Sequence, residues 1–323
     1  MANIFNNLIN ERGHLIADGA TGTNMMACGL PAGRPPDFWN IDGQEHISWL
    51  HESFIDVGAD IILTNTFGSN PCRLKLDKAE DRTREVNLAG AKLARAAADV
   101  SDRTVIVAGS IGPTGEMMEP FGSLTADAAE STFYEQAKVL AEGGVDIIWI
   151  ETIFAFDELA AAIRAGQMTG LPVVSTMTFD TASRTMMGDT PEKALEFSHT
   201  FEPRLAAFGA NCGAGPAMLI DTLARLCGAA EDEDVIISKG NCGIPQMIDG
   251  EIVYSGTNKV MADYARLARD CGAKIIGGCC GTTPERLRAI VNALDRYEPK
   301  AAPSQSDIVA ALGPIKVPSQ GSE

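Results

Sequence analysis

Short runs rich in valine and isoleucine recur along the chain and alternate with longer amphipathic segments. The runs are continuously apolar, which is typical of parallel strands that are covered by helices on both faces. We predict eight strands, at residues 14–18, 60–65, 104–109, 146–151, 172–178, 205–211, 234–239 and 274–278. Segments that suit helices lie between them, at residues 83–99, 127–142, 156–168, 215–228, 259–271 and 284–297.

Eight strand-then-helix units in about 300 residues predict an α/β protein with a single-domain (β/α)₈ barrel, the TIM barrel. A doubly wound sheet is the alternative fold, and it is disfavoured because no G-x-G-x-x-G pattern follows the first predicted strand. We place the barrel at residues 1–298. Residues 299–323, rich in Pro, Ser and Ala, are interpreted as a C-terminal tail with one short helical segment at 306–312.

The chain is acidic, with 43 Asp and Glu residues against 26 Lys and Arg residues and a formal net charge of −17. Nucleic acids and anionic membranes attract basic patches, so this balance opposes both as partners. The first residues lack the basic and apolar regions of a signal peptide, and no apolar run approaches the roughly 20 residues that span a bilayer. We expect a cytoplasmic protein with a small polar substrate, either monomeric or a homo-oligomer.

Reactive side chains of a (β/α)₈ barrel gather where the strands end and the βα loops begin. In this chain the predicted strand ends carry most of the unusual polar residues, so we expect those residues to face one rim of the barrel. They are Asp18-Gly19, Thr64-Asn65-Thr66, Gly109-Ser110, Glu151-Thr152, Asn211-Cys212, Asn241-Cys242 and Cys279-Cys280.

Three of the eight cysteines stand at predicted strand ends that would be close in space. Cys212 ends the sixth strand, Cys279 and Cys280 end the eighth, and only the seventh lies between them. Three thiolates around an open fourth position favour a catalytic Zn²⁺, because a structural zinc is usually closed by four protein ligands. The glycines of GGCCG let the backbone turn so that neighbouring thiols reach one point. A vicinal disulfide, or two unrelated small residues in a tight turn, are the alternatives.

Six segments, in order between about residue 10 and residue 297, resemble the homocysteine S-methyltransferase family. The combination of GANCG (209–213) with GGCCGTTPE (277–285) is highly specific for this family. The family includes betaine–homocysteine methyltransferases, S-methylmethionine-dependent enzymes and the homocysteine module of cobalamin-dependent methionine synthase, and it has a (β/α)₈ barrel. The segments are DGATGTN (18–24), GADIILTNTFGSN (58–70), GSIGPTGE (109–116), IET (150–152), GANCG (209–213) and GGCCGTTPE (277–285).

The resemblance implies that this chain transfers a methyl group to the thiolate of homocysteine, giving methionine. It implies a zinc ion on Cys212, Cys279 and Cys280, and it assigns the amino group of homocysteine to Glu151. Asn241 corresponds to an asparagine that fills the zinc site of methionine-synthase modules before substrate arrives. The expected substrate-binding residues are Asp18, Gly19, Thr21, Gly22, Asn65, Glu151 and Trp39.

The methyl donor is predicted from further stretches that resemble bacterial betaine–homocysteine methyltransferase-like proteins. These are DFWN (37–40), TFDTASRTMMG (178–188) and KGNCGIP (239–245). Betaine is therefore the favoured donor. Trp39 is the expected partner of its quaternary ammonium group, through a cation–π contact worth about 0.5–2 kcal/mol.

Two departures from the family pattern leave other donors open. The tyrosines that contact betaine in the family fall here on Gly68 and Thr152. One alternative is a stand-alone homocysteine module that accepts the methyl group from a separate corrinoid protein. Another is a sulfonium donor such as S-methylmethionine or dimethylsulfoniopropionate. A non-catalytic redox sensor, in which Cys279 and Cys280 form a reversible disulfide, is the alternative from a different functional class.

Overall fold

Eight parallel strands form the centre of the computed structural model, which describes residues 4–180, 182–248 and 251–315. Their order is β1-β10-β7-β6-β5-β4-β3-β2, and a bridge between Ala17 and Ile61 joins the two outer strands, closing the sheet. The predicted (β/α)₈ barrel is thereby confirmed. The strands are β1 (Leu15–Ile16), β2 (Ile61–Leu63), β3 (Ile106–Ile111), β4 (Ile147–Ile153), β5 (Val173–Met177), β6 (Ala207–Cys212), β7 (Ile236–Gly240) and β10 (Ile275–Gly278).

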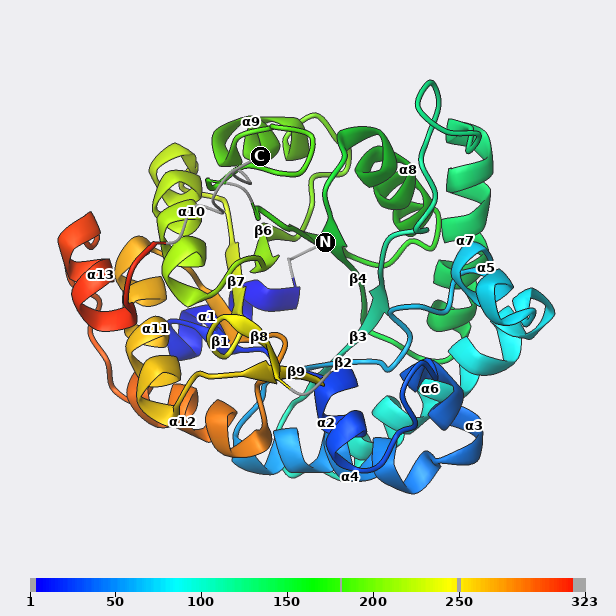
Figure 1. The fold of residues 1–323 in the computed structure, drawn as a ribbon, viewed down its shortest axis with the longest axis horizontal. Helices are drawn as coiled ribbons and strands as arrows, with labels where there is room; N and C mark the ends of the chain where they lie inside the picture. Colours follow the sequence, from blue (N-terminus) through cyan, green and yellow to red (C-terminus); the bar gives the residue numbers. More distant parts are fainter. Residues whose placement is uncertain (1–3, 181, 249–250, 316–323) are drawn as a thin grey trace.

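Helices surround the barrel on its outer side (Figure 1). Six were predicted: α6 (Thr83–Asp99), α7 (Ala126–Glu142), α8 (Phe156–Gln167), α10 (Pro216–Ala229), α11 (Asn258–Cys271) and α12 (Pro284–Leu294). The prediction did not include two other outer helices, α4 (Gln44–Val57) and α9 (Pro191–Ser198). The other helical pieces of the described chain are α1 (Ile4–Arg12), α2 (Gly22–Ala27), η1 (Pro36–Phe38), α3 (Trp39–Asp42), α5 (Pro71–Leu74), η2 (Lys75–Asp77), η3 (Glu80–Arg82) and α13 (Gln305–Leu312).

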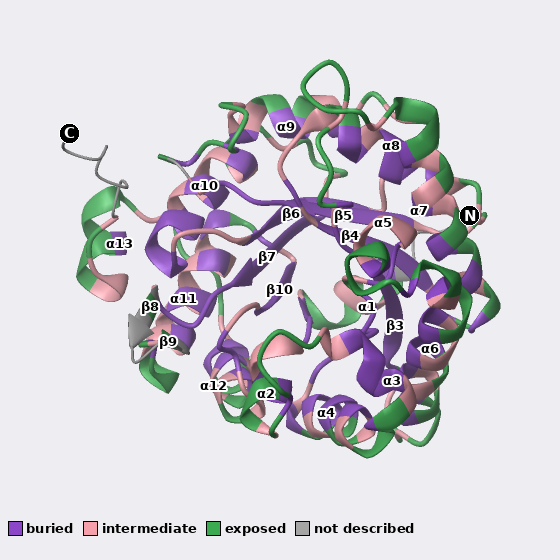
Figure 2. Cartoon of the chain, turned by 45° about the vertical axis from the view of Figure 1, so that its right-hand side comes forward, coloured by how far each residue is buried: buried purple, intermediate pink, exposed green. Residues whose placement is uncertain are grey.

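Side chains on the strands alternate between two apolar layers, because successive residues of a strand point to opposite faces. On β4, Ile147 and Trp149 lie in the barrel interior, whereas Ile148 and Ile150 pack against the surrounding helices. The strands and the inward faces of the helices are buried, and exposed residues lie on the outer faces (Figure 2). Phe5 of α1 is buried in the interior layer and adds to its packing.

A short antiparallel hairpin, β8 (Pro245–Ile248) and β9 (Glu251–Tyr254), follows β7 and was not predicted. Tyr254 of this hairpin lies against Gly281, directly after the cysteine pair. A Cβ atom at residue 281 would come within 2.5 Å of the Cβ of Tyr254, and Gly281 has a φ of +76°. Only glycine suits both conditions without strain.

The predicted helical segment near the C-terminus is present as α13, which packs on α10 and α11 and buries Ile308. Ser304 caps this helix, and Asp307 completes a capping box. The boundary between barrel and tail at residue 298 stays a prediction, and residues 316–323 of the predicted tail lie outside the described residues. Within the described part of the chain, no helix has the length and apolar character needed to cross a bilayer.

Candidate active site

The thiols of Cys212, Cys279 and Cys280 lie together at one rim of the barrel. Cys212 ends β6, while the other two follow β10, and both strands pair with β7. The Sγ atom of Cys212 lies 2.9 Å from Sγ of Cys279 and 3.8 Å from Sγ of Cys280. All three sulfur atoms lie within 4.8 Å of one another, in an arrangement that could hold a metal ion.

The backbone at the end of β6 is turned sharply. Cys212 adopts a φ of +60°, in the left-handed region that non-glycine residues rarely use, and Gly213 follows at +73°. Such conformations cost about 1–3 kcal/mol and persist where surrounding contacts impose them. Here they place the Cys212 side chain at the sulfur cluster.

Asn211, the residue before Cys212 in β6, stabilises this turn through its side chain. The sequence predicted only that Asn211 stands at a strand end. Its Oδ1 accepts a hydrogen bond from the backbone N–H of Thr152 at 3.0 Å. Its Nδ2 donates to Thr152 Oγ1 at 2.8 Å and to Cys279 Sγ at 3.8 Å. Asn211 therefore links the end of β4 to the sulfur cluster.

The protons of the three thiols are shared unequally. Hydrogen bonds from Cys212 and Cys279 lower the pKa of Cys280 to about 3. Hydrogen bonding to Cys279, together with burial, raises the pKa of Cys212. A bound cation would favour the thiolate form of all three cysteines, because metal ligation displaces thiol protons.

A buried amide side chain follows β7, the strand between the two strands that carry the cysteines. Asn241 is 3% exposed, and its Nδ2 donates to the carbonyl of Gly213 at 2.9 Å. Among the described residues its Oδ1 has no hydrogen-bond partner. The neighbouring backbone is joined to the cysteine loop, since Cys242 N–H donates to the Cys280 carbonyl at 2.8 Å. A buried acceptor without a donor costs about 1–3 kcal/mol, and a metal ion would relieve that cost.

Two buried carboxylates and a buried lysine lie inside the barrel close to this rim. Glu151 accepts a hydrogen bond from Ser110 Oγ at 2.5 Å, and Asp18 accepts one from Lys239 Nζ at 2.7 Å. Burial raises the pKa of Glu151 and of Asp18, and the charge of Lys239 opposes both shifts. Lys239 was not among the predicted site residues. The sequence feature that could have identified it is its position at the end of the apolar run DVIISK, a predicted buried strand. A charged side chain is rarely buried without a partner, so a lysine at this position indicates a buried ion pair.

The loop after β1 lies directly against the cysteine loop. Ala20 N–H donates to the Thr282 carbonyl at 3.1 Å, and Gly281 N–H donates to Thr23 Oγ1 at 3.1 Å. Gly19 allows this approach, because a Cβ atom there would lie 2.6 Å from the Thr282 carbonyl oxygen. The segment that holds Asp18, Gly19, Thr21 and Gly22 therefore borders the sulfur cluster, and substrate binding by these residues stays a prediction.

Two other predicted substrate residues have structural partners. Asn65 donates through Nδ2 to the Pro36 carbonyl at 2.8 Å and to Asn40 Oδ1 at 2.9 Å, so it braces the loop after β1. Trp39 is 8% exposed, and its ring stacks on His46 with centroids 4.5 Å apart. A role for Trp39 in donor binding stays a prediction, made for a side chain that already packs in the outer core.

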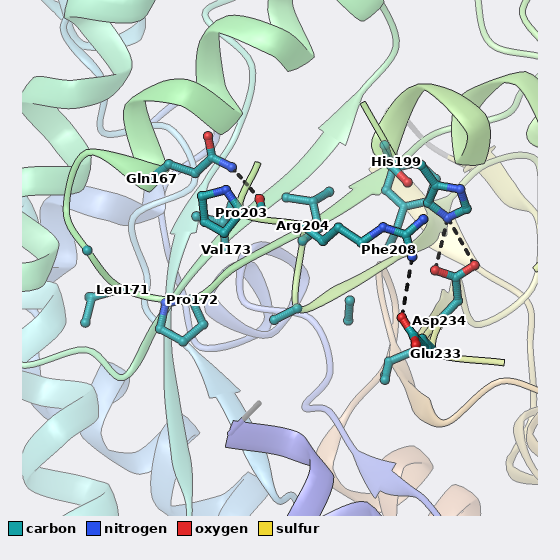
Figure 3. Close-up of a pocket in the computed structure, with 16 residues that line it drawn as sticks. Gln167, Leu171, Pro172, Val173, His199, Pro203, Arg204, Phe208, Glu233 and Asp234 are labelled. Carbon is teal, nitrogen blue, oxygen red and sulfur yellow. Dashed lines mark hydrogen bonds and ion pairs between the residues drawn. The ribbon is translucent and has the colours of Figure 1, made fainter. Parts of the chain in front are cut away.

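A cavity of about 560 Å³ lies at the other end of the barrel, where β5, β6 and β7 begin (Figure 3). Its charged side chains are paired: His199 Nε2 contacts Asp234 at 3.0 Å, and Arg204 contacts Glu231 at 2.9 Å. None of the predicted site residues lines it. Residues at this end of a (β/α)₈ barrel serve stability, whereas the C-terminal rim carries the active site.

The chain matches a known protein family and shares its fold with solved structures. A sequence model of the homocysteine S-methyltransferase family matches residues 15–294. The metallated form of the homocysteine methyltransferase MmuM from Escherichia coli superposes with a TM-score of 0.76 and 21% identity, over 88% of this chain and 98% of that chain. A methyltransferase from Methanosarcina mazei has a TM-score of 0.58 and 12% identity, over 90% and 97% of the two chains.

The two structural likenesses show that the barrel fold is shared. The family match spans nearly the whole barrel, from β1 through α12. This chain is a methyltransferase and belongs to the homocysteine S-methyltransferase family.

Proposed function

We propose that this chain transfers a methyl group to the thiol of homocysteine, giving methionine, with zinc held by Cys212, Cys279 and Cys280. The observation that carries the proposal is the meeting of these three thiols at the C-terminal rim of the barrel, within 4.8 Å of one another. The Oδ1 atom of Asn241, which has no hydrogen-bond partner in the described part of the chain, supports it, because an amide oxygen could complete the site until substrate binds.

Zinc would supply the activation of the thiol. A free thiol has a pKa of about 8.5 and is mostly protonated at neutral pH, whereas coordination to zinc favours the thiolate that attacks the methyl group. No side chain is then needed as a general base at the sulfur. The task left to the protein is to hold homocysteine so that its sulfur lies about 3–3.5 Å from the methyl carbon, in line with the leaving group.

The residues around the sulfur cluster are suited to that task. Glu151 is only 9% exposed, one of its oxygens accepts from Ser110, and the other has no partner within the described residues. A buried carboxylate with a free oxygen suits the substrate ammonium group. Asn211 fixes Cys279 and the end of β4 relative to each other. The backbone from Asp18 to Gly22 borders the cluster and is our proposed site for the substrate carboxylate.

Two donor classes are supported by different observations. Betaine is supported by the sequence, with Trp39 as the cation–π partner. A methyl group carried on a corrinoid protein is supported by the C-terminal rim, because the segments that follow β1, β2, β3 and β5 there each carry exposed apolar side chains. Exposed apolar patches are typical of sites that contact other macromolecules. These side chains are Met26, Phe67, Met117, Phe121, Met186 and Met187.

The test is to incubate zinc-loaded protein with homocysteine and, separately, with betaine, S-methylmethionine, dimethylsulfoniopropionate or a methylcorrinoid protein, and to measure methionine. We expect methionine with at least one donor, and none with any donor would contradict the proposed function. If betaine is the donor, Trp39→Ala should raise its KM by about 2- to 30-fold and leave the homocysteine KM unchanged, while Trp39→Phe keeps an aromatic ring as the control. Equal effects on both KM values would make Trp39 a support for its loop.

A further inference from the structure

Lys239 is a buried cation inside the barrel, next to the proposed substrate pocket. It lies two residues after Ile237, which faces the interior layer, and it is 2% exposed. Its Nζ lies 2.7 Å from Asp18 Oδ1 and 5.5 Å from the centroid of the Trp149 ring. A buried lysine is costly unless it is paired, so its neighbours must compensate its charge.

Asp18 has a hydrogen-bond donor of the protein at each carboxylate oxygen. One carboxylate oxygen accepts from Lys239, and the other accepts from the backbone N–H of Leu63 at 2.7 Å. The side chain is 1% exposed. Asp18 therefore forms a neutral pair with Lys239 that is tied to β2 and β7, so its charge is already compensated within the protein.

Glu151 differs from Asp18 in this respect. Its hydrogen bond from Ser110 occupies one oxygen, and within the described residues the second oxygen has no partner. Glu151 also lies close enough to interact electrostatically with Lys239, Asp18 and Cys280. Two carboxylates and one ammonium leave this group with a single net negative charge, located on the carboxylate that has a free oxygen.

We propose that Lys239 is a specificity-determining positioning residue: it neutralises Asp18, so that Glu151 carries the one uncompensated negative charge that attracts the ammonium group of an amino-thiol substrate. The inference rests on the proposed function, in which that substrate is homocysteine. Without Lys239, Asp18 becomes a second buried carboxylate that competes with Glu151 for the ammonium group and draws the thiol away from the sulfur cluster. The pocket would then bind a thiol with an amino group no better than a thiol without one.

The test compares homocysteine with 4-mercaptobutanoate, which is the same thiol acid without the amino group. Calorimetry on zinc-loaded protein gives the ratio of the two dissociation constants, and steady-state kinetics give kcat/KM for homocysteine. Lys239→Met should lower both the preference for homocysteine and its kcat/KM by about 10- to 100-fold, with 4-mercaptobutanoate binding nearly unchanged. The double variant Asp18→Asn/Lys239→Met has the wild-type net charge and should recover most of the preference.

Lys274→Met is the matched control, because Lys274 precedes β10 at the opposite end of the barrel and its Nζ contacts the Asp234 carbonyl. It should leave the preference unchanged. A purely structural Lys239 would weaken both ligands equally in Lys239→Met, and that result would overturn the proposal, as would an unchanged preference. Wild-type protein that binds no homocysteine would instead overturn the proposed function itself, and this inference with it.

Discussion

The wild-type protein is expected to bind about one zinc ion per chain, and replacing Cys279 or Cys280 with serine is expected to remove it and to lower methionine formation more than about 100-fold. The three sulfur atoms lie within 4.8 Å of one another, so each variant would leave only two thiols at the site. A serine hydroxyl does not replace a thiolate, because it stays protonated at neutral pH. Metal analysis of the purified variants measures the first effect, and a homocysteine methylation assay measures the second.

Cys72→Ser is the control for these two variants. Cys72 lies on α5, and its Sγ atom contacts Thr132 Oγ1 at 3.7 Å, away from the sulfur cluster. It should retain wild-type zinc and activity. A zinc content that equals the wild-type value in both Cys279→Ser and Cys280→Ser would show that these cysteines do not hold the metal.

Glu151→Gln is expected to raise the KM for homocysteine by about 10- to 100-fold and to leave the zinc content unchanged. In the wild-type protein, Ser110 Oγ donates a hydrogen bond to Glu151 Oε1 at 2.5 Å. Glutamine keeps an oxygen that can accept this bond, but it lacks the negative charge that attracts the substrate ammonium group. A hydrogen bond to a charged group contributes about 1.5–3 kcal/mol, which sets the size of the effect. Steady-state kinetics at saturating donor measure it.

An unchanged homocysteine KM in Glu151→Gln would remove Glu151 from the substrate pocket. Ser110→Ala is the companion variant, because it removes the hydrogen bond and keeps the carboxylate. It should raise the KM less than Glu151→Gln does. A larger effect in Ser110→Ala would indicate that the orientation of Glu151, and not its charge, is what the substrate requires.

The barrel could be predicted because its strands are buried on both faces and appear as continuous apolar runs. Every one of the eight predicted strands overlaps an observed strand of the sheet. The helix α4 was missed although its buried residues Ile47, Leu50 and Phe54 have the spacing of one face of a helix. The hairpin β8–β9 was missed because its strands have four residues each, too short for a clear alternation of apolar and polar side chains.

The sulfur cluster could be predicted from the sequence because the C-terminal ends of all strands in a (β/α)₈ barrel lie at the same rim. The role of Lys239 could not be found in the same way. Its partner Asp18 is on the first strand end, and only the closed sheet, in which β1 and β7 both pair with β10, brings the two side chains together. Likewise, the hydrogen bonds of Asn211 to Thr152 depend on side-chain directions that spacing alone does not define.

In the proposed reaction, the thiol of homocysteine joins the three cysteine sulfurs at one metal ion. X-ray absorption at the zinc edge counts the sulfur atoms around the metal directly. We predict three sulfur ligands and one oxygen or nitrogen ligand in the zinc-loaded protein, and four sulfur ligands after homocysteine is added. An unchanged set of ligands after saturation with homocysteine would contradict the account.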